Sequence, residues 1–96
     1  MTNEDRVRLF QLAVLAIEKL EREYPSYPPF ESIHNQLLFL LNQASGQPAD
    51  RDGLIRINLG VITVREVEPV DDSAAGLFYL VSAAAKEMLR EASRMS

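Results

Sequence analysis

Side chains that can carry acid–base or nucleophilic chemistry are few in this sequence. His34 is its only histidine, cysteine is absent, and no serine lies in a recognisable nucleophile turn. A catalytic triad needs a nucleophile, a base and an orienting group within hydrogen-bond reach. We therefore interpret His34 as a surface or hydrogen-bonding residue. The sequence predicts no catalytic residues, no cofactor-binding residues and no enzyme activity.

Metal and phosphate sites are also poorly supported. Carboxylates are most frequent in the second half of the chain, where the acidic residues include Asp50, Asp52, Glu66, Glu68, Asp71 and Asp72. Their spacing matches no calcium loop, and without cysteine there is no thiolate ligand for zinc. The four glycines are dispersed, so no glycine-rich phosphate loop exists. We expect a hydrated acidic surface with no metal and no cofactor.

Tyrosines and carboxylates together are the best candidates for contacts with a partner protein. Tyrosine on a proline-stiffened segment can act as a binding anchor, although it can equally pack the corner between two helices. Neighbouring carboxylates can attract a basic partner, although they can also form a solvated loop and a helix cap. The predicted partner-binding residues are Tyr24, Tyr27, Glu66, Glu68, Asp71, Asp72 and Tyr79.

Composition favours a small soluble protein. The chain has 96 residues, of which 47% are hydrophobic and 25% are charged, as in globular proteins. We expect one domain over residues 1–96. The formal net charge is −4 and the basic residues are scattered, which disfavours binding to nucleic acid. No secretory signal or membrane span is recognisable, so we expect a cytoplasmic protein with no membrane partner.

Three segments have the apolar periodicity of helices, and they are predicted at about 3–23, 29–45 and 72–94. Thr2 and Asp5 suit the start of the first helix, and Pro25 should end it near Tyr24. Gly46 suits the left-handed position after the second helix. The intervening Gln47–Gly53 segment is expected to be a surface loop. Leu37 and Val81 lie in the middle of apolar faces and are predicted core residues.

The segment from Leu54 to Glu68 has two interpretations. Its alternating and β-branched residues favour a hairpin at about 54–67 that turns at Leu59-Gly60. A helix at about 58–68, capped by Asn58, would instead place Val61, Val64 and either Ile62 or Val67 inward. The fold is therefore predicted to be all-α, a small bundle of about four helices, with α+β as the alternative.

A family resemblance adds to these patterns. Tyr24-Pro25-Ser26-Tyr27 is followed by Ser32 and Gln36-Leu37, and then by Leu59-Gly60, Val64-Arg65-Glu66 and an acidic stretch before an apolar helix. In order and spacing, residues 5 to 90 resemble small bacterial immunity proteins that neutralise type VI secreted, NAD(P)-hydrolysing effector toxins. The resemblance implies a mainly helical fold and favours the helix at 58–68.

The resemblance implies inhibition by binding, in which an immunity protein covers the active-site cleft of its cognate toxin. The predicted partner is therefore an effector toxin domain, with NAD(P) hydrolysis as its expected chemistry. A small helical adaptor or regulatory domain with a non-toxin partner is the alternative. An enzyme is the third hypothesis, and it is the one that the residues support least.

Overall fold

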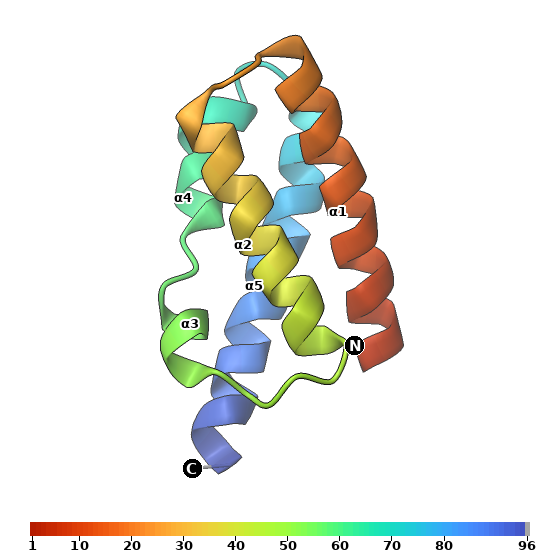
Figure 1. Ribbon diagram of the computed structural model, residues 1–96, viewed down its shortest axis with the longest axis vertical. Helices are drawn as coiled ribbons and strands as arrows, with labels where there is room; N and C mark the ends of the chain where they lie inside the picture. Colours follow the sequence, from red (N-terminus) through yellow and green to blue (C-terminus); the bar gives the residue numbers. More distant parts are fainter. Residues whose placement is uncertain (96) are drawn as a thin grey trace.

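The computed structural model describes residues 1–95. Within this range the secondary structure consists of helices, and there is no strand. Three long helices, α1, α2 and α5, make most of the bundle, and three short segments complete it (Figure 1). The bounds are α1 (Asn3–Glu23), α2 (Pro28–Ala44), α3 (Arg51–Ile55), α4 (Leu59–Ile62), the π-helical segment η1 (Thr63–Val67) and α5 (Asp72–Met95). The prediction of an all-α bundle is thus confirmed.

The ends of α1 follow the predicted signals. The Thr2 side chain accepts a hydrogen bond from the Asp5 backbone N–H, and the Asp5 carboxylate accepts one from the Thr2 backbone N–H. This reciprocal pair satisfies two N–H groups that the helix leaves free. The helix ends at Glu23, and Ser26 turns the chain with a φ of 58°. Pro28 then begins α2, where its missing N–H costs no hydrogen bond.

The connection between α2 and α4 contains a helix that the sequence analysis did not predict. Gly46 follows α2 with a φ of 110°, as expected for the left-handed position. The predicted loop at Gln47–Gly53, however, ends in the short helix α3, so this prediction is partly wrong. The Asp50 side chain caps α3 by accepting a hydrogen bond of 2.9 Å from the Gly53 N–H. Burial of Leu54 then anchors α3 in the core.

Residues 59–67 are helical, so the alternative of a β-hairpin at 54–67 is wrong. The predicted register of this helix is also wrong in part, because Val61 and Val64 are exposed and not inward. Leu59, Thr63 and Val67 occupy the inward positions, and all three are fully buried.

The four-residue spacing of these inward positions has a structural cause. The Thr63 hydroxyl donates to the Leu59 carbonyl at 2.7 Å, which satisfies its polar group inside the core. The Glu68 N–H then donates to the Thr63 carbonyl, at 2.9 Å and five residues back, as in a π turn. Thr63 and Val67 are four residues apart, so they lie on the same face of the helix and both point inward.

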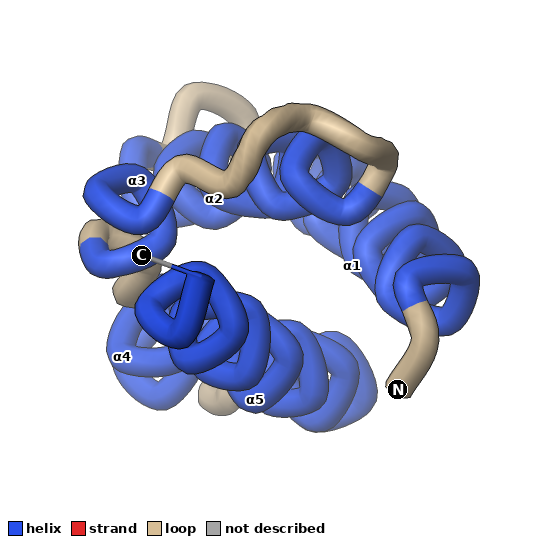
Figure 2. Tube along the Cα trace, turned by 90° about the horizontal axis from the view of Figure 1, so that it is seen from below, coloured by secondary structure: helices blue, strands red, loops and turns tan. Residues whose placement is uncertain are grey.

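The core lies between α1 and α2 on one side and α5 on the other, with α3 and α4 closing the remaining side (Figure 2). The predicted faces supply it: α1 contributes Phe10, Ala13 and Ile17, and α2 contributes Ile33 and Leu37. On α5 the fully buried residues include Phe78 and Val81. The predictions of Leu37 and Val81 as core residues are confirmed.

Two ion pairs, from the buried Arg6 to partly exposed glutamates, tie α1 to the last turns of α5. The Arg6 guanidinium is buried and donates to Glu87 at 2.6 Å and to Glu91 at 2.6 and 3.0 Å. The hydrogen bond from Arg6 lowers the pKa of the Glu91 carboxyl below its usual value. Since Arg6 is near the start of α1 and Glu91 near the end of α5, the two helices are antiparallel.

We expect Leu37→Ala to destabilise the fold by about 2–5 kcal/mol, and Val81→Ala by somewhat less, because each leaves a cavity in a closed core. Urea unfolding followed by circular dichroism measures both. The matched control is Leu38→Ala, because Leu38 is the next residue and is 42% exposed. Its loss should stay within about 0.5–1 kcal/mol. Equal losses for Leu37→Ala and Leu38→Ala would contradict the assigned helix face.

Candidate partner-binding surface

Two connectors meet at one end of the bundle and carry most of the predicted binding residues. The α1–α2 connector and the segment between η1 and α5 lie together there, whereas the termini lie toward the other end (Figure 1). Tyr24 and Tyr27 are on the first connector. Glu66 is in η1, Glu68 directly follows it, and Tyr79 is in the early part of α5. Folding thus gathers residues that are far apart in the sequence.

The first tyrosine group packs on Phe30 without being buried. The rings of Tyr24 and Tyr27 meet the Phe30 ring edge to face, with centroid distances of 5.8 and 4.9 Å. Phe30 is buried, but both tyrosines are exposed. The two interpretations of these tyrosines are therefore compatible, because each ring packs against Phe30 and keeps an exposed part.

A hollow of about 310 Å³ lies between this tyrosine group and the η1–α5 connector. Arg65 and Glu66 line it on one side, and Pro69 and Val70 add apolar surface. It can therefore hold an apolar or aromatic side chain beside one negative and one positive group.

Each of two tyrosines donates its hydroxyl to a glutamate. Tyr27 donates to Glu66, and Tyr79 donates to Glu68. The hydrogen bond to the glutamate, assisted by desolvation and by the carboxylate charge, raises the pKa of Tyr27 and likewise that of Tyr79. The phenols stay protonated at neutral pH, and the carboxylates they hold are fixed in position. We call these two pairs the tyrosine–carboxylate surface.

The two aspartates of the predicted set have different positions. Asp71 caps α5, because its carboxylate accepts a hydrogen bond of 3.0 Å from the Ala74 N–H. Asp72 is exposed in the first turn of α5, where its charge contributes to the raised pKa of Tyr79. Asp71 therefore has a structural role as a cap, and Asp72 adds negative charge beside the Tyr79–Glu68 pair.

A polar pair that the sequence analysis did not identify positions the start of α4. The Gln36 side chain accepts a hydrogen bond of 2.9 Å from the Asn58 N–H and donates one of 2.7 Å to the Asn58 side chain. Asn58 is thus at the predicted cap position, but its side chain bonds to α2 and not to its own helix. This link fixes the register of α4, and with it the placement of Glu66.

The single histidine pairs with a glutamate of α1. His34 Nδ1 lies 2.5 Å from a Glu21 carboxylate oxygen, which links α2 to α1. Within residues 1–95, no three histidine, aspartate or glutamate side chains are placed to hold a metal ion. None of the helices in that range is long and apolar enough to cross a membrane.

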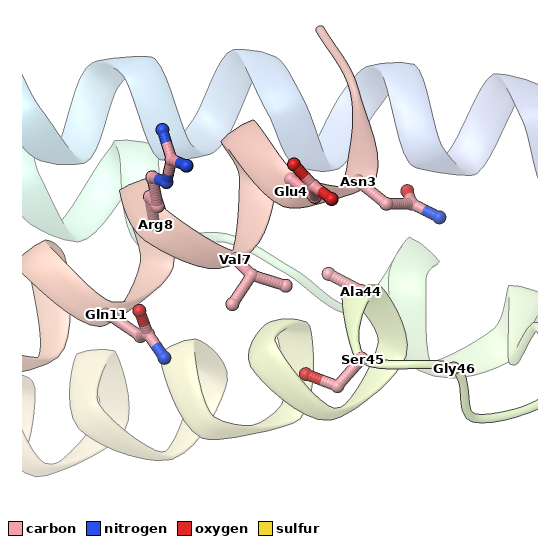
Figure 3. Close-up of a pocket in the computed structure, with 8 residues that line it drawn as sticks. All are labelled: Asn3, Glu4, Val7, Arg8, Gln11, Ala44, Ser45 and Gly46. Atoms are coloured by element: carbon pink, nitrogen blue, oxygen red, sulfur yellow. The ribbon is translucent and has the colours of Figure 1, made fainter.

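A second hollow, of about 510 Å³, lies between the first turns of α1 and the end of α2 (Figure 3). Val7 and Gln11 point across it toward α2, and Glu4 and Arg8 add opposite charges at its edge. Ser45 has no histidine or cysteine beside it among the residues that line this hollow. It includes none of the predicted binding residues.

We predict that Tyr27 and Tyr79 titrate above the ordinary phenol pKa of 10.0, each because of its own glutamate. Both hydrogen bonds should therefore persist through neutral pH and be lost only as the pH rises through the raised values. Carbon-13 NMR titration of labelled tyrosine measures this directly. Glu66→Gln should lower the pKa of Tyr27 and leave Tyr79 unchanged, and Glu68→Gln should do the reverse. Titration curves insensitive to both substitutions would exclude the two pairs.

Comparison with known proteins gives one family. Comparisons with curated proteins and with solved structures find no match. The family model described as Tsi6 matches residues 6–91, which include α1 from Arg6 onward, both connectors and nearly all of α5. Because this match spans most of the sequence, the chain belongs to the Tsi6 family, whose name denotes type VI secretion immunity proteins.

Proposed function

We propose that this protein is an immunity protein that binds a cognate type VI effector toxin and blocks the toxin's active site. The observation that carries the proposal is the family match over residues 6–91. We further propose that the toxin is an NAD(P) glycohydrolase, which follows the resemblance of the ordered motifs from Tyr24 to Glu66. The protein would then act as a single domain in the cytoplasm, where NAD(P) is consumed.

Inhibition by occlusion requires a partner-binding surface and no chemistry of the inhibitor's own. The tyrosine–carboxylate surface has the properties that such a contact needs. A toxin that binds a dinucleotide must accommodate a pyrophosphate, so its cleft should present cationic or N–H donor groups. Glu66 and Glu68 can face those groups, while Tyr24 and Tyr27 add aromatic area at low entropic cost.

The carboxylates would contribute mainly to encounter and specificity. Opposite charges on two proteins speed association, and mismatched charges reject incorrect partners. The hydrogen bonds from Tyr27 and Tyr79 hold Glu66 and Glu68 before the toxin arrives. Such preorganisation reduces the entropy lost on binding. Asp72 would add to the attraction, and Asp71 would support the surface as the cap of α5.

Co-expression tests the function itself. We expect this protein to restore growth of bacteria that express the toxin domain of the effector encoded beside it, and to preserve cellular NAD(P). Growth curves and an enzymatic cycling assay for NAD(P) measure the two effects. An unrelated small helical protein at equal expression is the control. Unchanged toxicity would favour the adaptor hypothesis. Rescue from a toxin that leaves NAD(P) intact would retain the immunity function and exclude the NAD(P) chemistry.

Charge reversal tests the surface. The Glu66→Lys/Glu68→Lys variant should remain folded by circular dichroism but bind the toxin more weakly, chiefly through slower association. The loss should be greatest at low salt, because salt screens exposed charges. Surface plasmon resonance at several salt concentrations separates the two rates. Glu18→Lys/Asp52→Lys changes the net charge equally elsewhere and is the matched control. If both variants lost affinity for the toxin equally, the effect would come from the net charge of the protein and not from this surface.

A further inference from the structure

The outward face of α4 and η1 has two valines that folding does not bury. Val61 is 58% exposed and Val64 is 56% exposed, although Leu59, Thr63 and Val67 on the other face are fully buried. Residues three apart on a helix are neighbours on its surface. The two valines therefore form one exposed apolar stripe.

Helix stability does not account for this stripe. β-Branched residues form helices less well than alanine, by up to about 0.7 kcal/mol per residue. A side chain that remains exposed offsets little of this cost through burial. Alanine at both positions would make the isolated protein at least as stable. Fold stability therefore does not explain why these exposed residues are valines.

The stripe lines a hollow between α4–η1 and α5. The hollow has a volume of about 350 Å³, and Tyr79 and Lys86 of α5 line it together with Val61 and Val64. Gly60 allows the two elements to come close at this point. A Cβ atom there would lie 2.8 Å from the Ser82 hydroxyl oxygen, which is too short a contact.

The edge of this hollow is charged. Tyr79, which lines it, donates its hydroxyl to Glu68 and lies close enough to Asp72 for that charge to act on it. Two carboxylates, Glu68 and Asp72, therefore act at the Tyr79 end of the hollow, and one cation, Lys86, is in its lining. A second copy of this chain would bring another net charge of −4 to the contact, whereas a cationic segment would be attracted.

We propose that this hollow receives an apolar side chain of the cognate toxin, flanked by a lysine or arginine that pairs with Glu68. The inference rests on the proposed function and names the chemistry of the partner's contact. The π turn supports it, because such turns in helices are frequent at functional sites. Apolar anchors in small hollows, surrounded by polar groups, contribute most of the affinity in many protein interfaces.

The test is the affinity of the purified toxin domain for the Val61→Ala/Val64→Ala variant, measured by isothermal titration calorimetry. We expect binding to weaken about tenfold or more. The thermal midpoint should stay equal or rise, because alanine is the better helix former. The matched control is Leu12→Ala/Leu15→Ala on α1, where the side chains are 56% and 63% exposed. The control variant should bind like the wild type.

Several outcomes would overturn the inference. One is that the valine variant binds the toxin with wild-type affinity. Another is that the leucine control loses as much affinity as the valine variant. Sedimentation equilibrium could also show that the wild type is a dimer and that the valine variant is a monomer. The hollow would then bind a second copy of this chain and not the toxin. Glu68→Gln should weaken binding at low salt and less at high salt, and no effect at either salt would exclude the cationic neighbour.

Failure of the inference and failure of the proposed function give different results. If the wild-type protein does not bind or neutralise the toxin, the proposed function is wrong and the inference fails with it. If the wild type neutralises the toxin and the valine variant binds equally well, only the assignment of this hollow is wrong.

Discussion

The short segment from Leu59 to Val67 closes the last side of the core, and its burial constrains much of the molecule. Leu59, Thr63 and Val67 must all face inward, although an α-helix does not align residues four apart perfectly. The segment changes from an α turn to a π turn at Thr63, and the hydroxyl of Thr63 bonds to the Leu59 carbonyl inside the core. The link between Gln36 and Asn58 then fixes where the segment begins.

The same constraint determines the outer surface. When Leu59 and Val67 turn inward, Val61 and Val64 must turn outward, and Glu66 comes within reach of Tyr27. The tyrosine–carboxylate surface and the valine-lined hollow are therefore two consequences of one register. The Tyr79–Glu68 pair and the hollow both include residues of α5, which packs against α1, α3, α4 and η1. A surface supported in this way is preorganised, which reduces the entropic cost of binding.

The two surfaces would make different contributions to inhibition. Exposed carboxylates act mainly on the association rate and depend on salt, whereas desolvated apolar contacts act mainly on the dissociation rate. Under the proposed function, binding of the toxin benefits from both fast encounter and slow release. The Arg6 ion pairs are remote from this contact, since they join the start of α1 to the end of α5. They link the two helices at the end away from the tyrosines.

The sequence by itself determined the long helices, because their apolar periodicity and end signals are local. Thr2, Pro25 and Gly46 act within a few residues of their own positions, so their roles were predictable. It also identified the tyrosines and carboxylates as a candidate set. Only the tertiary structure decided the register of α4 and η1, because Val61 and Leu59 are equally apolar and their burial depends on Gln36 and α5. The exposure of the two valines follows from that register. So does the pairing of Tyr27 with Glu66, which joins residues distant in the chain.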